Sequence, residues 1–373
     1  MESQKDRKES QTLRPPIQQG SRIPASNMIS LEALIELLDL RHLVIEGLLH
    51  PVEAVRAYIP HLDMFGLFGG KAFTPEVEIP DLTGKVILVT GGNTGLGRES
   101  IRQLAAHNPS RIYLAARTPS KGEAAVADFE KAFPSANIVY IPLDLCSFDS
   151  ISKAAKTFTS QSQRLDILMN NAGVMALPPG TTKEGFEAQL GTNHVGPALL
   201  TKLLMPILLA TANEPGADVR IINLASEAHI FARSADVVLD KSKLDAQSTW
   251  ARYGYSKLAN ILFTQELATR YPSIMSVAIH PGVIKSDLWI QNEHTSGIMK
   301  YVMAASLVLT GQSVEMGART QLWAATSKRG DVVSGGYYKP IGILSKGNSL
   351  AQNSKLAKEL WEWTENELKS KGF

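Results

Sequence analysis

Tyr253 and Lys257 stand four residues apart in the stretch YGYSK, a spacing that puts both side chains on one face of a helix. A tyrosine hydroxyl can give a proton to an oxygen on which negative charge develops, but its ordinary pKa of about 10 makes it a reluctant acid at neutral pH. A neighbouring lysine favours the tyrosinate, and we expect Lys257 to lower the pKa of Tyr253. The pair suits acid–base work on a carbonyl or an alcohol. Taken alone, the same spacing is also typical of a packed tyrosine and an exposed lysine.

A second region with chemical potential is the turn in VILVTGGNTGLGRES, which begins at Val86 and sets four glycines within seven residues after an apolar run. A P-loop is excluded, because Arg98 and Glu99 stand where that motif requires a lysine and a hydroxyl. A dinucleotide-binding turn needs a strand, glycines and a helix whose N-terminal amides face a pyrophosphate, and this context fits. The glycines run as GxxxGxG rather than GxGxxG, and glycines after a strand can also serve a tight chain reversal alone.

The end of the next apolar run bears on the choice of dinucleotide. NAD-binding folds place an acidic residue there for the ribose hydroxyls, whereas a ribose phosphate needs a cation. The sequence reads LAARTPSK, with neutral Ala116 followed by Arg117 and Lys121. A solvated surface arginine is the alternative, but the pattern favours NADP.

Strand-like apolar runs alternate with helical segments from about residue 80 onward. The predicted strands are 86–89, 112–115, 138–141, 165–169, 219–224, 275–279 and a last one near Tyr337. This alternation predicts an α/β fold, a Rossmann-type doubly wound parallel sheet forming a single catalytic domain at 80–373. Ligands of such sheets bind beyond the carboxyl ends of the strands, so polar residues there deserve the closest reading.

Short motifs fall at those ends or on the helices that follow. They are LDL at Asp144, NNAG from Asn170, TNHVG around Asn193, NLAS ending at Ser226, YGYSK, and HPG ending at Gly282. In this order, and together with TGGNTGLG, they resemble the short-chain dehydrogenase/reductase family from about Leu82 to the C-terminus. The stretches IPDLTGK, YLAAR and LWEWTENEL are similar to its retinol-dehydrogenase-like branch and to fungal relatives named after protochlorophyllide reductase.

The resemblance implies roles for individual residues. Tyr253 would be the acid, Ser226 would bind the substrate oxygen, Lys257 would also hold the nicotinamide ribose, and Asn193 would support a water-linked proton path. The residues that would contact NADP(H) are Gly91, Asn93, Thr94, Gly95, Leu96, Gly97, Arg117, Lys121, Asp144, Leu145, Asn171, Ala172, Gly173, Tyr253, Lys257, Pro281, Gly282, Val283 and Ser286. Ser286 stands where the family more often has threonine.

Composition and charge exclude several other kinds of protein and of site. The chain has 373 residues, 44% of them hydrophobic and 20% charged, which is a globular composition. A formal net charge of +2 without a dense basic run argues against nucleic acid as the main partner. The single cysteine, Cys146, excludes an internal disulfide, and the motif-adjacent His194, His229 and His280 lack metal-ligand partners at suitable spacing, so no metal is expected.

The N-terminal part precedes the resemblance. Residues 1–27 are polar and predicted to be disordered, and 28–79 is predicted to be a helical extension. Apolar residues recur at helical spacing through 29–59, but acidic residues among them prevent insertion across a bilayer. Packing on the main domain or on a partner is the simpler interpretation, and contact with a membrane surface is the alternative. No charge-free run of spanning length and no targeting signal is seen, so we expect a cytoplasmic protein. The oligomeric state stays open.

These observations predict an NADP-dependent oxidoreductase that interconverts a carbonyl and an alcohol on a bulky apolar small molecule, for example in secondary metabolism. The segment after HPG, with Trp289 among its apolar residues, is predicted to be a mobile lid over the substrate, with ordinary core packing as the alternative. An enoyl reductase and a catalytically silent NADP-binding regulatory or scaffold protein are the other functions considered. The intact set of Asn193, Ser226, Tyr253 and Lys257 argues against the silent protein.

Overall fold

The structure is a computed structural model that describes residues 71–284 and 311–373, all within Pro60–Phe373, one of the two units into which the chain divides. The predictions for 1–27, for 28–70 and for the lid therefore lie outside the described residues. Within 71–79 the structure shows one short helix, α3 (Pro75–Glu78). The domain boundary near residue 80 stays a prediction.

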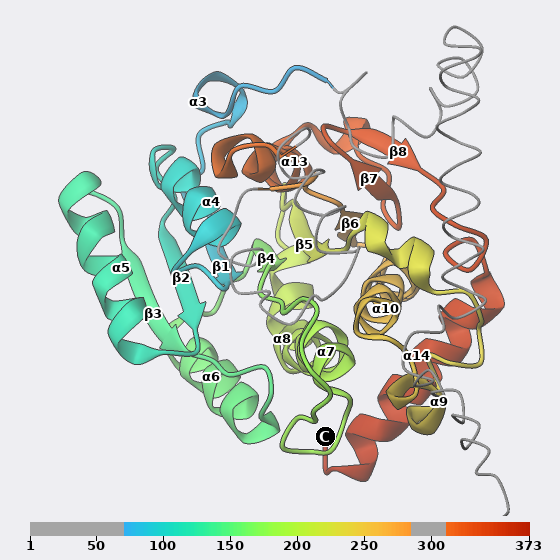
Figure 1. Ribbon diagram of the computed structural model, residues 1–373. Helices are drawn as coiled ribbons and strands as arrows, with labels where there is room; N and C mark the ends of the chain where they lie inside the picture. Colours follow the sequence, from blue (N-terminus) through green and yellow to red (C-terminus); the bar gives the residue numbers. More distant parts are fainter. Residues whose placement is uncertain (1–70, 285–310) are drawn as a thin grey trace, which may run out of the picture. The chain divides into compact units, whose positions relative to one another are not determined.

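One twisted sheet forms the centre of the described part (Figure 1). Its strands, in sequence order, are β1 (Val86–Thr90), β2 (Arg111–Ala116), β3 (Ile138–Pro142), β4 (Ile167–Asn170), β5 (Val219–Leu224), β6 (Ile274–Ile279), β7 (Tyr337–Lys339) and β8 (Ile343–Ser345). Their spatial order is β3-β2-β1-β4-β5-β6-β7-β8, and only the β7–β8 pair is antiparallel. The reversal of strand order at β1 and β4 is the feature that defines a Rossmann-type fold.

Strands β1 to β6 are mainly apolar because both faces of the sheet are covered there. In β1, Leu88 packs into one core while Ile87 and Val89 pack into the other. Residues of α6 (Phe148–Gln161), α8 (Gly196–Ala212), α10 (Thr249–Arg270) and α14 (Ser354–Ser370) fill the first core. Residues of α4 (Gly95–Ala105), α5 (Pro119–Ala132) and α13 (Val314–Thr326) fill the second. Figure 1 shows these two groups on opposite sides of the sheet.

Shorter elements connect these layers. They are α7 (Ala188–Leu190), a π-helical turn (Gly191–Val195) that runs directly into α8, a 3-10 turn called η4 (Glu227–Phe231), α9 (Lys241–Asp245) and a second 3-10 turn (Arg329–Asp331). The continuous helix Ala188–Ala212 is long and apolar enough to cross a membrane, but 67% of its most apolar window is buried inside the protein. That burial is typical of a core helix.

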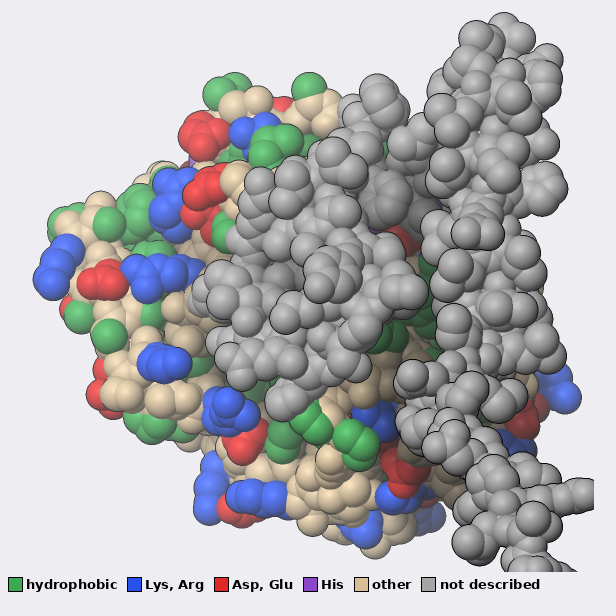
Figure 2. All heavy atoms as spheres, viewed as in Figure 1, with side chains coloured by type: hydrophobic (Ala, Val, Ile, Leu, Met, Phe, Trp, Pro, Cys, Tyr) green, Lys and Arg blue, Asp and Glu red, His purple; other side chains and the backbone are tan. Residues whose placement is uncertain are grey.

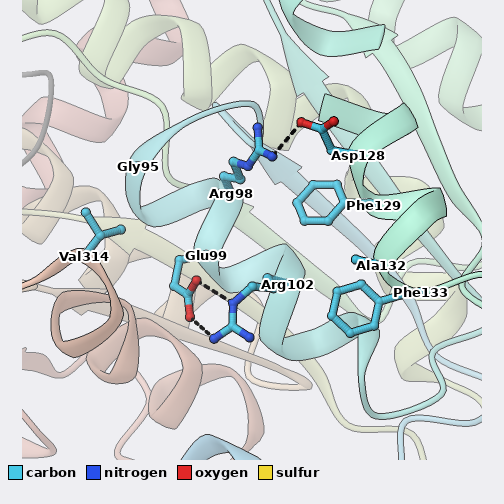
Figure 3. Close-up of a pocket in the computed structure, with 9 residues that line it drawn as sticks. All are labelled: Gly95, Arg98, Glu99, Arg102, Asp128, Phe129, Ala132, Phe133 and Val314. Carbon is cyan, nitrogen blue, oxygen red and sulfur yellow. Dashed lines mark hydrogen bonds and ion pairs between the residues drawn. The ribbon is translucent and has the colours of Figure 1, made fainter. Parts of the chain in front are cut away.

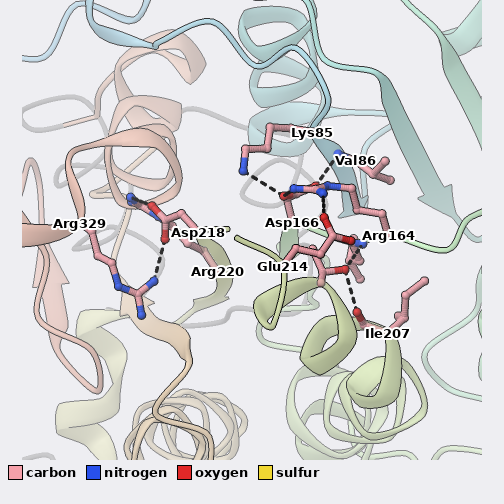
Figure 4. A network of polar contacts seen from close by, with 11 residues as sticks. Lys85, Val86, Arg164, Asp166, Ile207, Glu214, Asp218, Arg220 and Arg329 are labelled. Atoms are coloured by element: carbon pink, nitrogen blue, oxygen red, sulfur yellow. Dashed lines mark hydrogen bonds and ion pairs between the residues drawn. The ribbon is translucent and has the colours of Figure 1, made fainter. Parts of the chain in front are cut away.

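Charged side chains brace the amino-terminal edge of the sheet (Figure 4). Asp166, fully buried before β4, accepts hydrogen bonds from the Val86 amide at 2.9 Å and from Arg164 Nε at 2.7 Å, and pairs with Lys85 at 3.1 Å. Buried carboxylates require such partners. This fixes β1 against β4 at the edge opposite to the one where the predicted site residues lie.

Candidate active site

The glycine turn after β1 is shaped by close contacts. An added Cβ at Gly97 would lie 2.4 Å from the carbonyl oxygen of Gly91 and 2.5 Å from Asn171 Nδ2, so no larger residue fits there. Gly91 and Gly95 have φ angles of +68° and +53°, in the region that favours glycine. At Gly95, which begins α4, an added Cβ would meet no atom of the described residues within 4 Å. Among the described residues, nothing blocks the N-terminus of this helix from an approaching anion.

The loop after β4 holds this turn in place. Asn171 Nδ2 donates to the carbonyl oxygen of Thr90 at 2.8 Å, and the Ala172 amide donates to Thr90 Oγ1 at 3.0 Å. From α13, the buried Gln321 Nε2 donates to the carbonyl oxygen of Leu96 at 3.3 Å and to Asn171 Oδ1 at 3.4 Å. Sequence analysis missed Thr90 and Gln321. Thr90 sits inside the glycine motif and could have been found, whereas nothing near Gln321 signals its role.

Arg117 and Lys121 are exposed, directly after β2 and at the start of α5. At the end of β3, Asp144 Oδ1 accepts from the Cys146 amide at 3.0 Å, and Leu145 is buried. The predicted dinucleotide residues of β1, β2 and β3 thus lie at the carboxyl ends of neighbouring strands.

Arg98 lies in the first turn of α4, three residues after Gly95. Its guanidinium pairs with Asp128 at 2.9 Å over the ring of Phe129, beside a surface hollow of about 260 Å³ between α4 and α5 (Figure 3). In the same hollow, Arg102 pairs with Glu99 at 2.6 Å. Acidic and basic side chains are mixed over this part of the surface (Figure 2). The charges of both arginines are therefore matched within the protein.

Ser226, Tyr253 and Lys257 come together where β5 and α10 meet. Tyr253 and Lys257 are 6% and 5% exposed, and Lys257 Nζ lies 5.6 Å from the centre of the Tyr253 ring. The Ser226 hydroxyl, two residues after β5, lies close enough to the Tyr253 side chain to favour its ionised form. Lys257 Nζ donates to the carbonyl oxygen of Leu224 at 2.9 Å, and Asn260 Nδ2 donates to the same oxygen at 2.9 Å. Asn260, one helical turn after Lys257, was not predicted.

The pKa of Tyr253 differs from our expectation. Burial raises the pKa of Tyr253 to about 12, and the nearby Ser226 hydroxyl only partly opposes that rise. Burial also lowers the pKa of Lys257 to about 8. The prediction that Lys257 brings the pKa of Tyr253 below its ordinary value is therefore wrong for the protein without cofactor. The reason is that desolvation disfavours the charged form of both groups, and burial cannot be read from YxxxK spacing.

Asn193 occupies the π-helical turn before α8, a distortion that recurs at functional sites. Its Oδ1 accepts from the Val174 amide at 2.7 Å, and its Nδ2 donates to the Val174 carbonyl at 2.9 Å and to Ser256 Oγ at 2.8 Å. An added Cβ at Gly173 would lie 3.0 Å from Asn193 Oδ1 and 3.5 Å from Lys257 Nζ. The structure therefore brings Asn193 to the same place as Lys257 and explains the glycine of NNAG.

The surroundings of Tyr253 are apolar on one side. Met175, Ala176 and Tyr253 form a small cluster separate from the two cores, against which Ala228 and Trp250 pack. The Trp250 ring meets the Tyr253 ring edge to face, with 6.1 Å between centroids. Next to Ala228, the η4 residues Ile230 and Phe231 are 40% and 36% exposed. Apart from Tyr253, these side chains were not predicted, because isolated apolar residues carry no sequence signal for a pocket.

Beyond β6, Pro281 and Val283 are partly buried, and Gly282 has a φ angle of +97°. The Val283 carbonyl accepts from the Gln312 amide at 2.8 Å. Ser286 and Trp289 lie outside the described residues. Within the two described ranges, the acidic, histidine and cysteine side chains form no group that could hold a metal ion.

Known proteins are similar to this chain over most of its length. The family model described as short chain dehydrogenase matches residues 85–297. A short-chain dehydrogenase/reductase of Armillaria gallica is 38% identical over 296 residues, covering 78% of this chain and 93% of the relative. Retinol dehydrogenase 12 of Mus musculus is 36% identical over 296 residues, covering 79% of this chain and 88% of the relative.

Solved structures agree. An uncharacterised protein from Mycobacterium paratuberculosis has a TM-score of 0.60 at 28% identity, covering 80% of this chain and 98% of that one. An NADPH-bound carbonyl reductase from chicken fatty liver has a TM-score of 0.52 at 23% identity, covering 71% and 99%, which is a likeness of fold. The chain belongs to the short-chain dehydrogenase/reductase family of oxidoreductases, which use NAD(P)(H), and to its retinol-dehydrogenase-like branch.

Proposed function

We propose that the protein is an NADP-dependent oxidoreductase that interconverts a carbonyl and an alcohol on a bulky apolar small molecule, with Tyr253 as the acid and base. The observation that carries this proposal is the convergence of the Ser226 hydroxyl, the Tyr253 hydroxyl and the Lys257 ammonium group in one buried place. That place lies at the carboxyl edge of the sheet, as does the open glycine turn.

The residues present fit a dinucleotide. The open face at Gly95 and the N-terminal amides of α4 suit a pyrophosphate, and the exposed Arg117 and Lys121 suit a ribose phosphate. Lys257 Nζ, held by the Leu224 carbonyl at the end of β5, suits the nicotinamide ribose. When bound, the cofactor supplies or accepts the hydride.

The side chains then handle the proton and the substrate oxygen. In carbonyl reduction, the hydride goes to the carbonyl carbon and the Tyr253 hydroxyl gives its proton to the oxygen, forming the alcohol. Ser226 Oγ donates to that oxygen and stabilises its developing charge. The resulting tyrosinate is favoured by Lys257, and Asn193 holds the loop at Val174 beside it. Alcohol oxidation is the same sequence reversed.

The raised pKa of Tyr253 keeps its hydroxyl protonated in the chain without cofactor, and this is the form that carbonyl reduction requires. A tyrosine whose pKa is raised to about 12 keeps its proton at neutral pH, so it is ready to act as an acid. Acting as a base would first require that proton to be lost, which becomes less favourable by about 1.4 kcal/mol for each unit of pKa.

The apolar cluster around Tyr253 supports the substrate class. Met175, Ala228 and Trp250 offer apolar contact next to the reacting hydroxyl, and the exposed Ile230 and Phe231 extend that surface outward. Burying apolar substrate surface contributes roughly 25 cal/mol per Å², so affinity is expected to rise with the size of an apolar carbonyl compound.

The test is to incubate the purified protein with NADPH or NADH and a panel of aldehydes, ketones and enones of increasing apolar size, identifying each product. We expect alcohols from bulky apolar carbonyls with NADPH, and a higher KM but nearly unchanged kcat in Trp250→Ala. Saturated ketones from enones would instead show an enoyl reductase. NADPH binding without turnover of any compound would favour the silent regulatory protein.

A further inference from the structure

The turn that carries Ser226 is tied at two points to the C-terminal part of the chain. His229 Nε2 accepts a hydrogen bond from the backbone N–H of Asn348, 119 residues later, at 3.1 Å. Glu227 accepts from the Tyr337 hydroxyl at 2.7 Å and pairs with Lys339 Nζ at 3.1 Å. The segment around β7 and β8 therefore anchors η4, which begins directly after Ser226.

The partners of His229 define which ring nitrogen carries the proton. A backbone N–H can only donate, so Nε2, which receives the Asn348 amide, must be the acceptor. Nδ1 then carries the hydrogen and donates it to the carbonyl oxygen of Ser226, at 2.8 Å. The ring is 1% exposed, and burial lowers the pKa of His229, which keeps this neutral form at neutral pH.

Close contacts with the C-terminal part of the chain surround the His229 ring. An added Cβ at Gly347, whose φ angle is +67°, would lie 3.1 Å from His229 Nε2, so the glycine lets the chain approach the ring. Asn348 Nδ2 donates to the carbonyl oxygens of His229 and Ala232, at 3.1 and 3.2 Å. The Tyr337 ring packs edge to face on the imidazole, with 5.2 Å between centroids.

These contacts bear on the serine hydroxyl. The Ser226 carbonyl receives both the backbone amide of His229, at 3.1 Å, and its ring Nδ1. Ser226 Oγ accepts the Ala228 amide at 3.1 Å, a bond that does not use the hydroxyl hydrogen. A residue held at both its carbonyl and its side chain has little freedom to move its Oγ relative to Tyr253.

We propose that His229 is a positioning residue for catalysis: in its Nδ1-protonated form it links the turn at Asn348 to the Ser226 carbonyl and fixes the serine hydroxyl against Tyr253. This inference rests on the proposed function, because it assigns His229 an effect that passes through Ser226. Moving one hydrogen-bond donor of an active site out of its position typically lowers kcat on the order of 100-fold.

Two substitutions separate the two ends of the link. Asparagine places a side-chain nitrogen where Nδ1 lies and keeps the donor to Ser226, whereas glutamine reaches the position of Nε2 and keeps the acceptor for Asn348. We expect His229→Gln, which loses the donor to Ser226, to lower kcat on the order of 10- to 100-fold with unchanged NADPH affinity, and His229→Asn, which loses only the bond to Asn348, to lower kcat less. An unchanged kcat in His229→Gln, or a larger loss in His229→Asn, would overturn the proposal.

A matched control loosens the same C-terminal turn without touching His229. Gln265 Nε2, on α10, donates to the carbonyl oxygen of Ala351 at 2.8 Å, so Gln265→Met should reduce stability and spare kcat. A loss of kcat in Gln265→Met as large as in His229→Gln would assign the effect to general loosening and overturn the proposal.

The decisive comparison uses the Ser226→Ala background. If His229 acts through the serine, Ser226→Ala/His229→Gln has the kcat of Ser226→Ala alone, while fully additive losses contradict it. An unchanged kcat in Ser226→Ala would instead refute the proposed function, so the two failures are distinct. Should His229→Gln not fold, the ¹⁵N resonances of the His229 ring in the unaltered protein decide, since an Nε2-protonated or charged ring is incompatible with the proposed link.

Discussion

Replacing Lys257 by methionine is predicted to stabilise the cofactor-free protein while removing its activity. Lys257 is 5% exposed, and burial lowers its pKa from 10.5 to about 8, so the folded chain holds an ammonium group against a desolvation penalty. Methionine has similar length and no charge. The Leu224 carbonyl, which would lose its bond to Lys257, keeps the one from Asn260 at 2.9 Å.

The magnitude follows from the shift and has a definite sign. A lysine with a lowered folded pKa contributes its full penalty below about pH 8, and the penalty disappears as the pH rises to the unfolded value of 10.5. At 1.36 kcal/mol for each unit, the shift corresponds to about 3 kcal/mol at pH 7, an upper figure because the lost hydrogen bond offsets part of it. Lys257→Met should therefore be more stable at pH 7, with a gain that shrinks above pH 8.

The assay is urea unfolding of cofactor-free protein at pH 7 and at pH 9.5. The exposed Lys328 provides the control, because Lys328→Met removes a charge without a buried penalty and should change stability little at either pH. The reasoning is refuted if Lys257→Met is less stable than the unaltered protein at pH 7, or if its stability difference is the same at both values.

Two further predictions concern the cofactor. Gly97→Ala should weaken NADPH binding by at least about 10-fold and lower Tm by several degrees, because its methyl would lie 2.4 Å from the Gly91 carbonyl oxygen. Gly330→Ala, whose methyl would meet no atom of the described residues within 4 Å, is the control for calorimetry and NADPH titration. Equal behaviour of the two variants would argue against a rigid turn. Arg117→Ala should reduce the preference for NADPH over NADH, measured as the ratio of kcat/KM values, by on the order of 10- to 100-fold, as expected for the loss of a charge-assisted contact worth about 1.5–3 kcal/mol. An undiminished ratio would exclude Arg117 as the phosphate ligand.

Much of the fold could be predicted from the sequence because its signal is local. Apolar runs bounded by turn residues predicted each end of β1 to β6 to within two residues. Both ends of β5 were predicted at their observed residues. The short antiparallel β8, with Leu344 55% exposed, was missed because three residues without a buried face carry little pattern. The π-helical turn at Asn193 was missed too, since propensities do not distinguish it from an α-helix.

The site was predicted from motifs, and the contacts that adjust it were not. Spacing on one helix placed Tyr253 and Lys257 together, but their pKa values depend on burial by other parts of the chain. The link from His229 to Asn348 joins residues 119 positions apart, and neither residue type indicates the other. Long-range polar contacts of this kind depend on how distant segments of the chain pack together, so the periodicity of the sequence does not predict them.

The most direct test of the account is the turnover of Tyr253→Phe. Phenylalanine keeps the ring that packs on Trp250 but removes the hydroxyl that lies near Ser226 and carries the proton. With NADPH and a bulky apolar ketone, the account predicts a kcat lower by about 10²- to 10⁴-fold and an NADPH dissociation constant that does not change. A Tyr253→Phe variant that keeps a near-normal kcat would contradict the assignment of Tyr253 as the acid.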